Sequence, residues 1–344
     1  KKQRKKYLIL SLIFNLSILF VFKYFGFFSK FLNTILSNLS LPNTPIFNFL
    51  LPVGISFYTF QILSYSIQVY NGEIKSEKHF GIFALYAAFF PTILSGPIER
   101  ANHLIPQLYK KYVFNHDRVV TGLKIVLWGL FLKLVIANRM SILVNAVYDN
   151  VLDFTGIPLI IATIFFAFQI YSDFAGYSFI ALGIALVLGF NLINNFQRPY
   201  FSKSILEFWR RWHISLSSWF RDYIYIPLGG NRVKKSRWFF NILIVFLIIG
   251  LWHGASWTFI IWGGLNGVYL ISSVLTLGIR KKITEIICLT KFPNIHRIIK
   301  IIITFVLICI SWIFFRANSF PDAIYILTHL FTNLNLNFFG PSLG

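Results

Sequence analysis

The chain has 344 residues, of which 56% are hydrophobic and 12% are charged, and its 32 Lys and Arg outnumber its 11 Asp and Glu. Soluble domains average about twice that charged fraction, because polar groups must cover their surface. A mean hydropathy of +0.68 and apolar runs near or beyond the ~18 residues that span a bilayer predict an all-α, polytopic integral membrane protein. A soluble enzyme and a disordered chain are excluded.

Apolar segments recur along the whole chain and predict about eight to ten membrane helices. No small-residue cleavage site follows the first segment, Tyr7 to Phe28, so it is interpreted as a retained span and not as a signal peptide. The stretch from Ile157 to Phe190 is long enough for two crossings. The other predicted segments are Ile46 to Tyr70, Phe80 to Leu94, Val119 to Ala137, Trp238 to Trp252, Trp257 to Leu277 and Ile298 to Phe315.

Several of these segments are interrupted by helix-breaking residues. Pro52 and Gly54 break one, Pro91 breaks another, and Gly250 to Gly254 separates two more. Breaks at membrane depth are tolerated only where the freed backbone is buried in protein or lines a wet cavity, so they indicate an internal chamber. No repeat or long linker divides the sequence. We therefore expect one membrane-embedded domain over residues 1–344.

The basic residues lie in short links between apolar segments and set the topology. Five of them precede the first span, which predicts a cytoplasmic N-terminus by the positive-inside rule. The links from Arg198 to Arg237 and from Arg280 to Lys300 carry nine and six Lys and Arg and are expected on the same side, with the segments between them forming a hairpin. Nucleic-acid binding is disfavoured because it needs a continuous basic face.

His253 is the first candidate for chemistry. It follows Ile242 to Trp252, a run without ionisable residues, and small residues come after it. An ionisable side chain at the deep end of such a run is costly to bury and indicates a functional site. The alternative is a neutral structural histidine that is hydrogen-bonded to a backbone carbonyl.

His213 is the second candidate. At helical spacing it shares one face with Leu206, Trp209, Leu216 and Phe220, while charged residues lie away from that face. This pattern predicts a continuous interfacial amphipathic helix with His213 on its buried side. The alternative is again a hydrogen-bonded structural histidine.

Other chemistries lack a pattern in this sequence. Asp173 is the acidic residue placed most clearly at membrane depth, where it could bind a cation or orient a partner. Cys288 and Cys309 are isolated, which predicts neither a disulfide framework nor a metal site. The sequence has no nucleophile elbow and no P-loop, which disfavours a common hydrolase and an ATP-driven pump.

Four stretches together resemble the membrane-bound O-acyltransferase (MBOAT) family, in its bacterial branch of alginate and peptidoglycan O-acetylation membrane proteins. The resemblance covers about Pro52 to Arg316. The first two stretches are LSGPIER at 94–100 and FQIYSDFAGYS at 168–178, and the last is GLWHGA at 250–255. The third stretch is a longer block that contains RPY at 198–200, WRRWH at 209–213, RDY at 221–223 and PLGGNR at 227–232. The family usually has further membrane segments at its ends, so we expect this chain to be incomplete.

The resemblance implies that His253 matches the essential active-site histidine of the family and that His213 matches its second histidine. It also implies a ring of membrane helices around a central tunnel, with amphipathic cytoplasmic helices. Asp173 and residues in the matching stretches are expected to bind or orient substrate. These residues are Gln169, Trp252, Trp209, Arg210 and Ser217.

The implied reaction moves an acetyl group from a cytoplasmic thioester, across the membrane, for O-acetylation of an envelope or extracellular polysaccharide. The donor is acetyl-coenzyme A or an acyl carrier protein, with no resident cofactor or metal, and a periplasmic acetyltransferase is the expected partner. The expected location is the bacterial inner membrane. His253 would serve as general base, and His213 or neighbouring donors would polarise the carbonyl.

Two other classes of protein remain as alternatives. A transporter or flippase of a cell-envelope intermediate also has broken helices and buried polar residues. A non-catalytic scaffold for a periplasmic acetyltransferase would tolerate substitution of both histidines. Transfer of acetyl to an acceptor distinguishes the enzyme from both.

Overall fold

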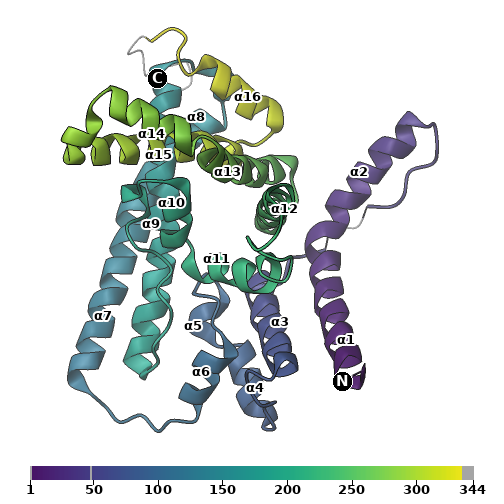
Figure 1. Cartoon of the computed structure of the whole chain (residues 1–344). Helices are drawn as coiled ribbons and strands as arrows, with labels where there is room; N and C mark the ends of the chain where they lie inside the picture. Colours follow the sequence, from purple (N-terminus) through teal and green to yellow (C-terminus); the bar gives the residue numbers. More distant parts are fainter. Residues whose placement is uncertain (1, 47–48, 335–344) are drawn as a thin grey trace. The chain divides into compact units, whose positions relative to one another are not determined.

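A computed structural model describes residues 2–46 and 49–334, and every regular element within these ranges is a helix. The all-α, polytopic membrane fold expected from the sequence is confirmed. The chain divides into two compact units, and Figure 1 shows their helices coloured in chain order. Unit 1 contains Lys1–Leu127 and Ser178–Ile193, and unit 2 contains Trp128–Tyr177 and Asn194–Gly344.

Six helical stretches in the described residues are long and apolar enough to cross a membrane, fewer than the eight to ten expected. Single helices form four of them: α9 (Ile157–Leu188), α12 (Lys235–His253), α13 (Trp257–Leu275) and α15 (Pro293–Arg316). The other two are Gln3–Asn38, with α1 (Lys2–Leu19), η1 (Phe20–Tyr24) and α2 (Phe25–Asn38), and His116–Tyr148, with α7 (His116–Leu130), η2 (Phe131–Ala137) and α8 (Asn138–Tyr148).

The α9 helix corrects one expectation, because the stretch from Ile157 to Phe190 forms one helix of 32 residues and not two crossings. Its glycines serve helix packing and do not interrupt it. In unit 1, a Cβ on Gly183 would lie 2.5 Å from the carbonyl oxygen of Gly122, and in unit 2 a Cβ on Gly176 would lie 2.9 Å from that of Gly129. Small residues let helix backbones approach closely in this way.

Unit 1 contains short helices where the sequence predicts broken segments. Pro91 is the second residue of α5, the short helix that follows α4. Helix α3 begins directly after Gly54, whose φ of 74° is left-handed. A small core of Tyr86, Phe89, Leu104 and other buried residues joins these helices to the end of α9. The helices are α3 (Ile55–Asn71), α4 (Phe80–Ala87), α5 (Phe90–Ile93) and α6 (Ala101–Leu108).

Unit 2 is built around the hairpin of α12 and α13, which was expected from the two apolar segments and the break after Trp252. Gly250 and Gly263 make the close approach possible: a Cβ on Gly263 would lie 2.2 Å from the carbonyl oxygen of Phe246. The remaining elements are η3 (Val151–Asp153), η4 (Pro199–Phe201), α10 (Ile205–Arg211), α11 (Ile214–Phe220), η5 (Arg221–Tyr225), α14 (Leu277–Ile286), η6 (Leu289–Lys291) and α16 (Phe320–His329).

Candidate active site

The segment around His213 differs from the single amphipathic helix that the sequence predicts. Helix α10 ends at Arg211, α11 begins at Ile214, and His213 between them has a left-handed backbone with φ 44° and ψ 56°. Such a conformation costs a non-glycine residue about 1–3 kcal/mol and is concentrated at functional sites. Leu206 was expected on the buried face with His213 but is exposed, and the break in the helix at His213 separates it from Leu216 and Phe220, which are buried.

Asn195 holds the chain at this break. Its backbone carbonyl accepts a hydrogen bond from the Ile214 amide at 3.0 Å, and its side-chain Oδ1 accepts one from the Ser215 amide at 3.1 Å. These are the first two amides of α11, which have no partner inside the helix. Asn195 is fully buried. It therefore caps α11 from 20 residues away, a contact that sequence spacing did not indicate.

His213 itself is buried, with only 1% of its surface exposed. Its ring meets that of Phe174 edge to face at a centroid distance of 4.5 Å, and Trp252 lies at 6.1 Å. Burial lowers the pKa of His213 well below its ordinary value, and the neighbouring His253 lowers it further. The imidazole is therefore neutral near pH 7 and has one N–H donor and one acceptor nitrogen.

His253 is the last residue of α12 and is partly buried. Its ring centroid lies 4.8 Å from that of Trp252, 5.0 Å from that of Trp262 and 5.3 Å from that of Phe315. Trp252 contacts both histidine rings, so the two residues singled out in the sequence belong to one aromatic cluster. The glycine contact between α12 and α13 is what places Trp262 beside His253.

The aromatic cluster also includes Trp262 and Trp312, which the sequence did not single out. Trp262 and Trp312 stack at a centroid distance of 5.7 Å, and Trp209 lies 5.8 Å from Trp262. The indole Nε1 atoms of Trp209 and Trp262 are buried and have no hydrogen-bond acceptor among the described residues. Buried donors without an acceptor are rare in proteins and are a candidate site for a polar ligand. Tryptophans inside apolar spans gave no signal that separated these positions from ordinary packing.

The other predicted site residues occupy different surroundings. Asp173 forms an ion pair with Lys133, while the next residue, Phe174, contacts His213. Gln169 keeps its Oε1 buried without a donor among the described residues. The Ser217 hydroxyl donates to the Trp212 carbonyl at 3.3 Å, and the Arg210 side chain is exposed. Trp209 and Trp252 thus join the cluster, whereas Arg210 lies at the surface.

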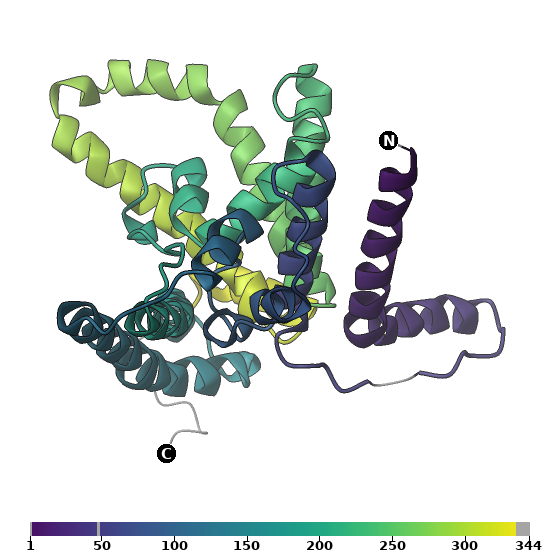
Figure 2. The same cartoon turned by 90° about the horizontal axis from the view of Figure 1, so that it is seen from below.

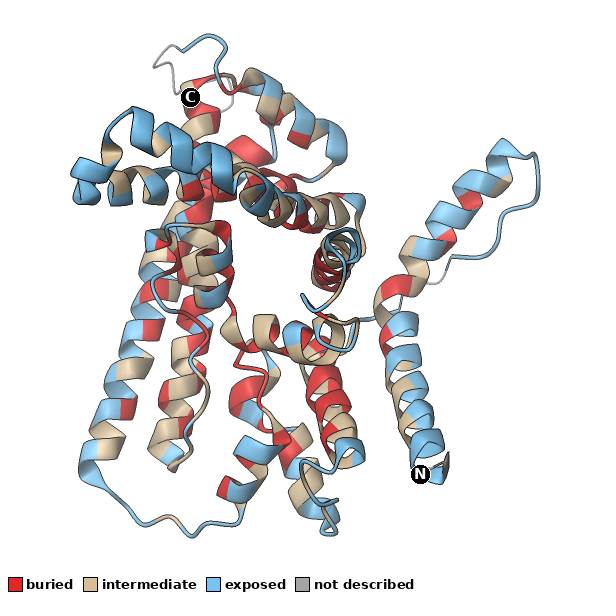
Figure 3. Cartoon of the chain, in the orientation of Figure 1, coloured by how far each residue is buried: buried red, intermediate tan, exposed pale blue. Residues whose placement is uncertain are grey.

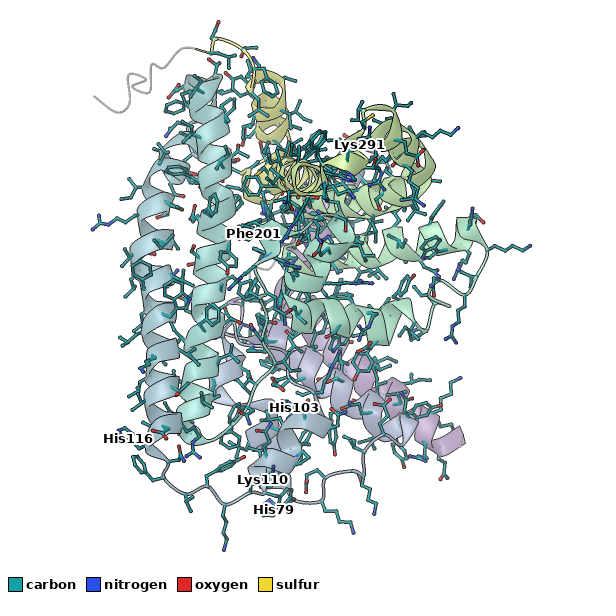
Figure 4. The ribbon with its side chains drawn as sticks, turned by 60° about the vertical axis from the view of Figure 1, so that its left-hand side comes forward. His79, His103, Lys110, His116, Phe201 and Lys291 are labelled. Carbon is teal, nitrogen blue, oxygen red and sulfur yellow. The ribbon has the colours of Figure 1, made fainter. Side chains whose placement is uncertain are left out.

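Three other histidines, His79, His103 and His116, lie in unit 1 and are labelled in Figure 4. His79 caps α4, and His116 is exposed. His103 bonds at 2.6 Å to the fully buried carboxylate of Glu99. This bond raises the pKa of His103 above its ordinary value, against a smaller opposing effect of burial.

Comparison with known proteins decides the family. The family model of MBOAT, the membrane-bound O-acyltransferase family, matches residues 73–318. The chain belongs to the membrane-bound O-acyltransferase family. The matched range contains both histidines and the aromatic cluster.

Curated relatives of this MBOAT chain are named for acyl transfer to alginate, peptidoglycan or teichoic acid. It is 38% identical over 324 residues to the probable alginate O-acetylase AlgI of Pseudomonas aeruginosa, covering 93% of this chain and 59% of that protein. It is 35% identical over 351 residues to the peptidoglycan O-acetyltransferase of Helicobacter pylori, covering 94% and 64%. A teichoic acid D-alanyltransferase of Bacillus subtilis is 29% identical over 301 residues, covering 81% and 72%. The chain thus spans about three fifths of the length of the two O-acetylation relatives.

Proposed function

We propose that this protein is an O-acyltransferase that moves an acetyl group from a thioester for O-acetylation of an envelope or extracellular polysaccharide. The observation that carries the proposal is the contact of Trp252 with both His213 and His253 inside one aromatic cluster. Relatives named for O-acetylation are 35–38% identical, whereas the D-alanyltransferase of Bacillus subtilis is 29% identical, which favours acetyl as the group transferred.

His253 acts as the general base in this proposal. Its ring takes the proton of the acceptor hydroxyl while the hydroxyl oxygen attacks the thioester carbonyl carbon. The carbon–sulfur bond then breaks, and the protonated His253 returns the proton to the leaving thiolate. One ester bond forms, one thioester bond is lost, and the histidine ends the cycle neutral. Its position at the end of α12, partly buried among aromatic rings, supports this role.

Stabilisation of the carbonyl oxygen is assigned to neutral donors around His253. The neutral His213 ring supplies one N–H. The buried indole N–H groups of Trp209 and Trp262, which have no acceptor among the described residues, are two further candidates. Fixed donors in a water-poor site stabilise developing negative charge strongly, because they need no reorganisation during the reaction.

The remaining predicted residues have supporting roles. The ion pair with Lys133 fixes Asp173 on α9, and this holds Phe174 against the His213 ring, so Asp173 orients the site indirectly. The Oε1 of Gln169, which has no donor among the residues that the structure describes, is an acceptor for a substrate hydroxyl. Ser217 steadies the turn at Trp212. Arg210 is exposed and is assigned to donor binding at the surface.

The donor is proposed to arrive from the cytoplasm as acetyl-coenzyme A or as an acyl carrier protein thioester. The basic residues in and around the His213 segment would attract either polyanion. We place the protein in the bacterial inner membrane with a cytoplasmic N-terminus and helices around a tunnel, and we expect a periplasmic acetyltransferase to complete delivery.

The test supplies a labelled acetyl thioester to membranes that contain the protein. The wild type is expected to label a polysaccharide, and His253→Ala is expected to lose the labelling at unchanged protein level. His116→Ala changes an exposed histidine and is the matched control. Movement of an unmodified substrate without thioester consumption would support a transporter, and full labelling with His253→Ala would support a scaffold; either result would contradict the proposal.

A further inference from the structure

Helix α14 presents an apolar face that the other described residues leave exposed. Ile279, Ile283 and Ile286 follow one another at helical spacing and are 61%, 49% and 78% exposed. No residue of α14, all of which the structure describes, is buried. Figure 3 shows this helix mostly in the pale blue of exposed residues. Contact of these three side chains with water is unfavourable, because the removal of apolar surface from water is favourable.

Basic residues border this apolar face. Arg280 and Lys282 flank it, and Lys281 lies on the opposite side of the helix, as the spacing of 100° per residue requires. Arg280 also donates to the Ser273 carbonyl near the end of α13, which fixes that side chain at the start of the helix. The segment from Leu277 to Lys300 contains six Lys and Arg but one acidic residue, Glu285. The segment is therefore both amphipathic and strongly cationic.

The chain connections put α14 at a membrane surface. It begins two residues after α13 ends, and α15 begins at Pro293, so the segment joins two candidate spans. Figure 2 shows it in light green as an arc at the edge of unit 2, and Figure 4 labels Lys291 near its end. Both spans must leave the bilayer on the same side, because the 17-residue link between them is too polar and too short to cross it.

We infer that α14 lies in the membrane interface, with its isoleucine face among the acyl chains and its Arg and Lys side chains on anionic lipid headgroups. Interfacial helices of this kind bind through buried apolar area and attraction to anionic lipid together. Charge complementarity selects the anionic lipid over a zwitterionic one. This surface is separate from the aromatic cluster and does not depend on the proposed reaction.

The native Cys288 gives a direct probe, because it is exposed immediately after α14, whereas Cys309 is buried. In a Cys309→Ala background, a nitroxide on Cys288 is measured in nanodiscs of phosphatidylcholine alone and of phosphatidylcholine with phosphatidylglycerol. Membrane-soluble oxygen and a water-soluble nickel chelate report its surroundings. We expect a higher ratio of oxygen to nickel accessibility in the mixture that contains phosphatidylglycerol.

Two variants and one control separate the contributions. The triple change Arg280→Gln, Lys281→Gln and Lys282→Gln is expected to abolish the difference between the two mixtures, and Ile279→Asn with Ile283→Asn is expected to expose the nitroxide in both. Lys78→Gln, Lys110→Gln and Lys111→Gln remove the same charge from exposed links and should change nothing. Exposure of the wild-type nitroxide to nickel in both mixtures would overturn the inference and assign the face to a soluble partner. If the wild-type nitroxide were equally protected from the nickel chelate in both mixtures, the selectivity for anionic lipid would be overturned.

Discussion

Asn195 accepts a hydrogen bond from the Ser215 amide at 3.1 Å, and this contact secures the helix that begins directly after His213. Asn195→Leu keeps the approximate size of the side chain but removes the acceptor. An amide left buried without a partner costs about 1–3 kcal/mol. We expect a lower melting temperature in detergent and a lower rate of acetyl transfer.

Asn194→Leu is the control for this prediction. Asn194 is the adjacent residue but is exposed, and its Oδ1 accepts a local hydrogen bond from the Phe196 amide. Equal melting temperatures for the two variants would show that Asn195 does not hold the His213 turn.

The glycine contact between α12 and α13 should tolerate no added methyl group. A Cβ on Gly263 would lie 2.2 Å from the Phe246 carbonyl, so Gly263→Ala must separate the helices, at a cost of about 1–3 kcal/mol. Gly264→Ala meets only a flexible leucine terminus at 3.3 Å. We therefore expect Gly263→Ala to have a lower unfolding temperature than Gly264→Ala. Similar unfolding temperatures would refute the close packing of α12 and α13 beside Trp262 and His253.

The buried His213 predicts a loss of stability toward acid. Its pKa in the folded protein is well below the value of about 6.5 of an exposed histidine, so the unfolded chain binds more protons as the pH falls below that value. The contribution of the neutral His213 ring to the free energy of unfolding is complete above pH ~6.5. It decreases as the pH falls from that value toward the pKa of His213 in the folded protein. Melting temperatures measured between about pH 5 and 8 should fall less steeply toward acid for His213→Gln. Parallel profiles would contradict a neutral, buried ring.

His103 predicts the opposite dependence. The Glu99 carboxylate raises its pKa, so the folded protein binds the extra proton and gains stability below the ordinary histidine value of about 6.5. That gain is lost as the pH rises through the higher folded pKa. His103→Gln should remove the alkaline decline relative to the wild type, measured by thermal unfolding. A steeper alkaline decline in the variant would reverse the assigned sign.

The sequence predicted those features that depend on local pattern. The length of the apolar segments predicted helices that span the membrane, and Pro91 and Gly54 lie near observed helix boundaries. His253 was singled out because it is an ionisable residue after a long apolar run. The sequence singled out both histidines, whose catalytic roles stay predictions, but it did not indicate the contact of each with Trp252.

Features set by distant contacts could not be predicted. The turn at His213 depends on Asn195, which bonds to Ser215 across 20 residues of sequence, so a helical pattern alone predicted that α10 and α11 are continuous. A glycine in an apolar run is compatible with a break or with close packing, and only the facing Gly129 shows that Gly176 serves packing. The partner of Asp173 is Lys133, 40 residues away.

The most direct test of the account is the rate of labelled acetyl transfer for His213→Gln, His253→Gln and the double variant. General acid–base catalysis contributes about 10²–10⁴-fold, so His253→Gln should lose a factor in that range. Residues that act in one step are non-additive, and the double variant should be no slower than the slower single variant. If the loss of rate in the double variant equalled the product of the two single losses, or if His253→Gln kept full activity, a shared reaction site would be contradicted.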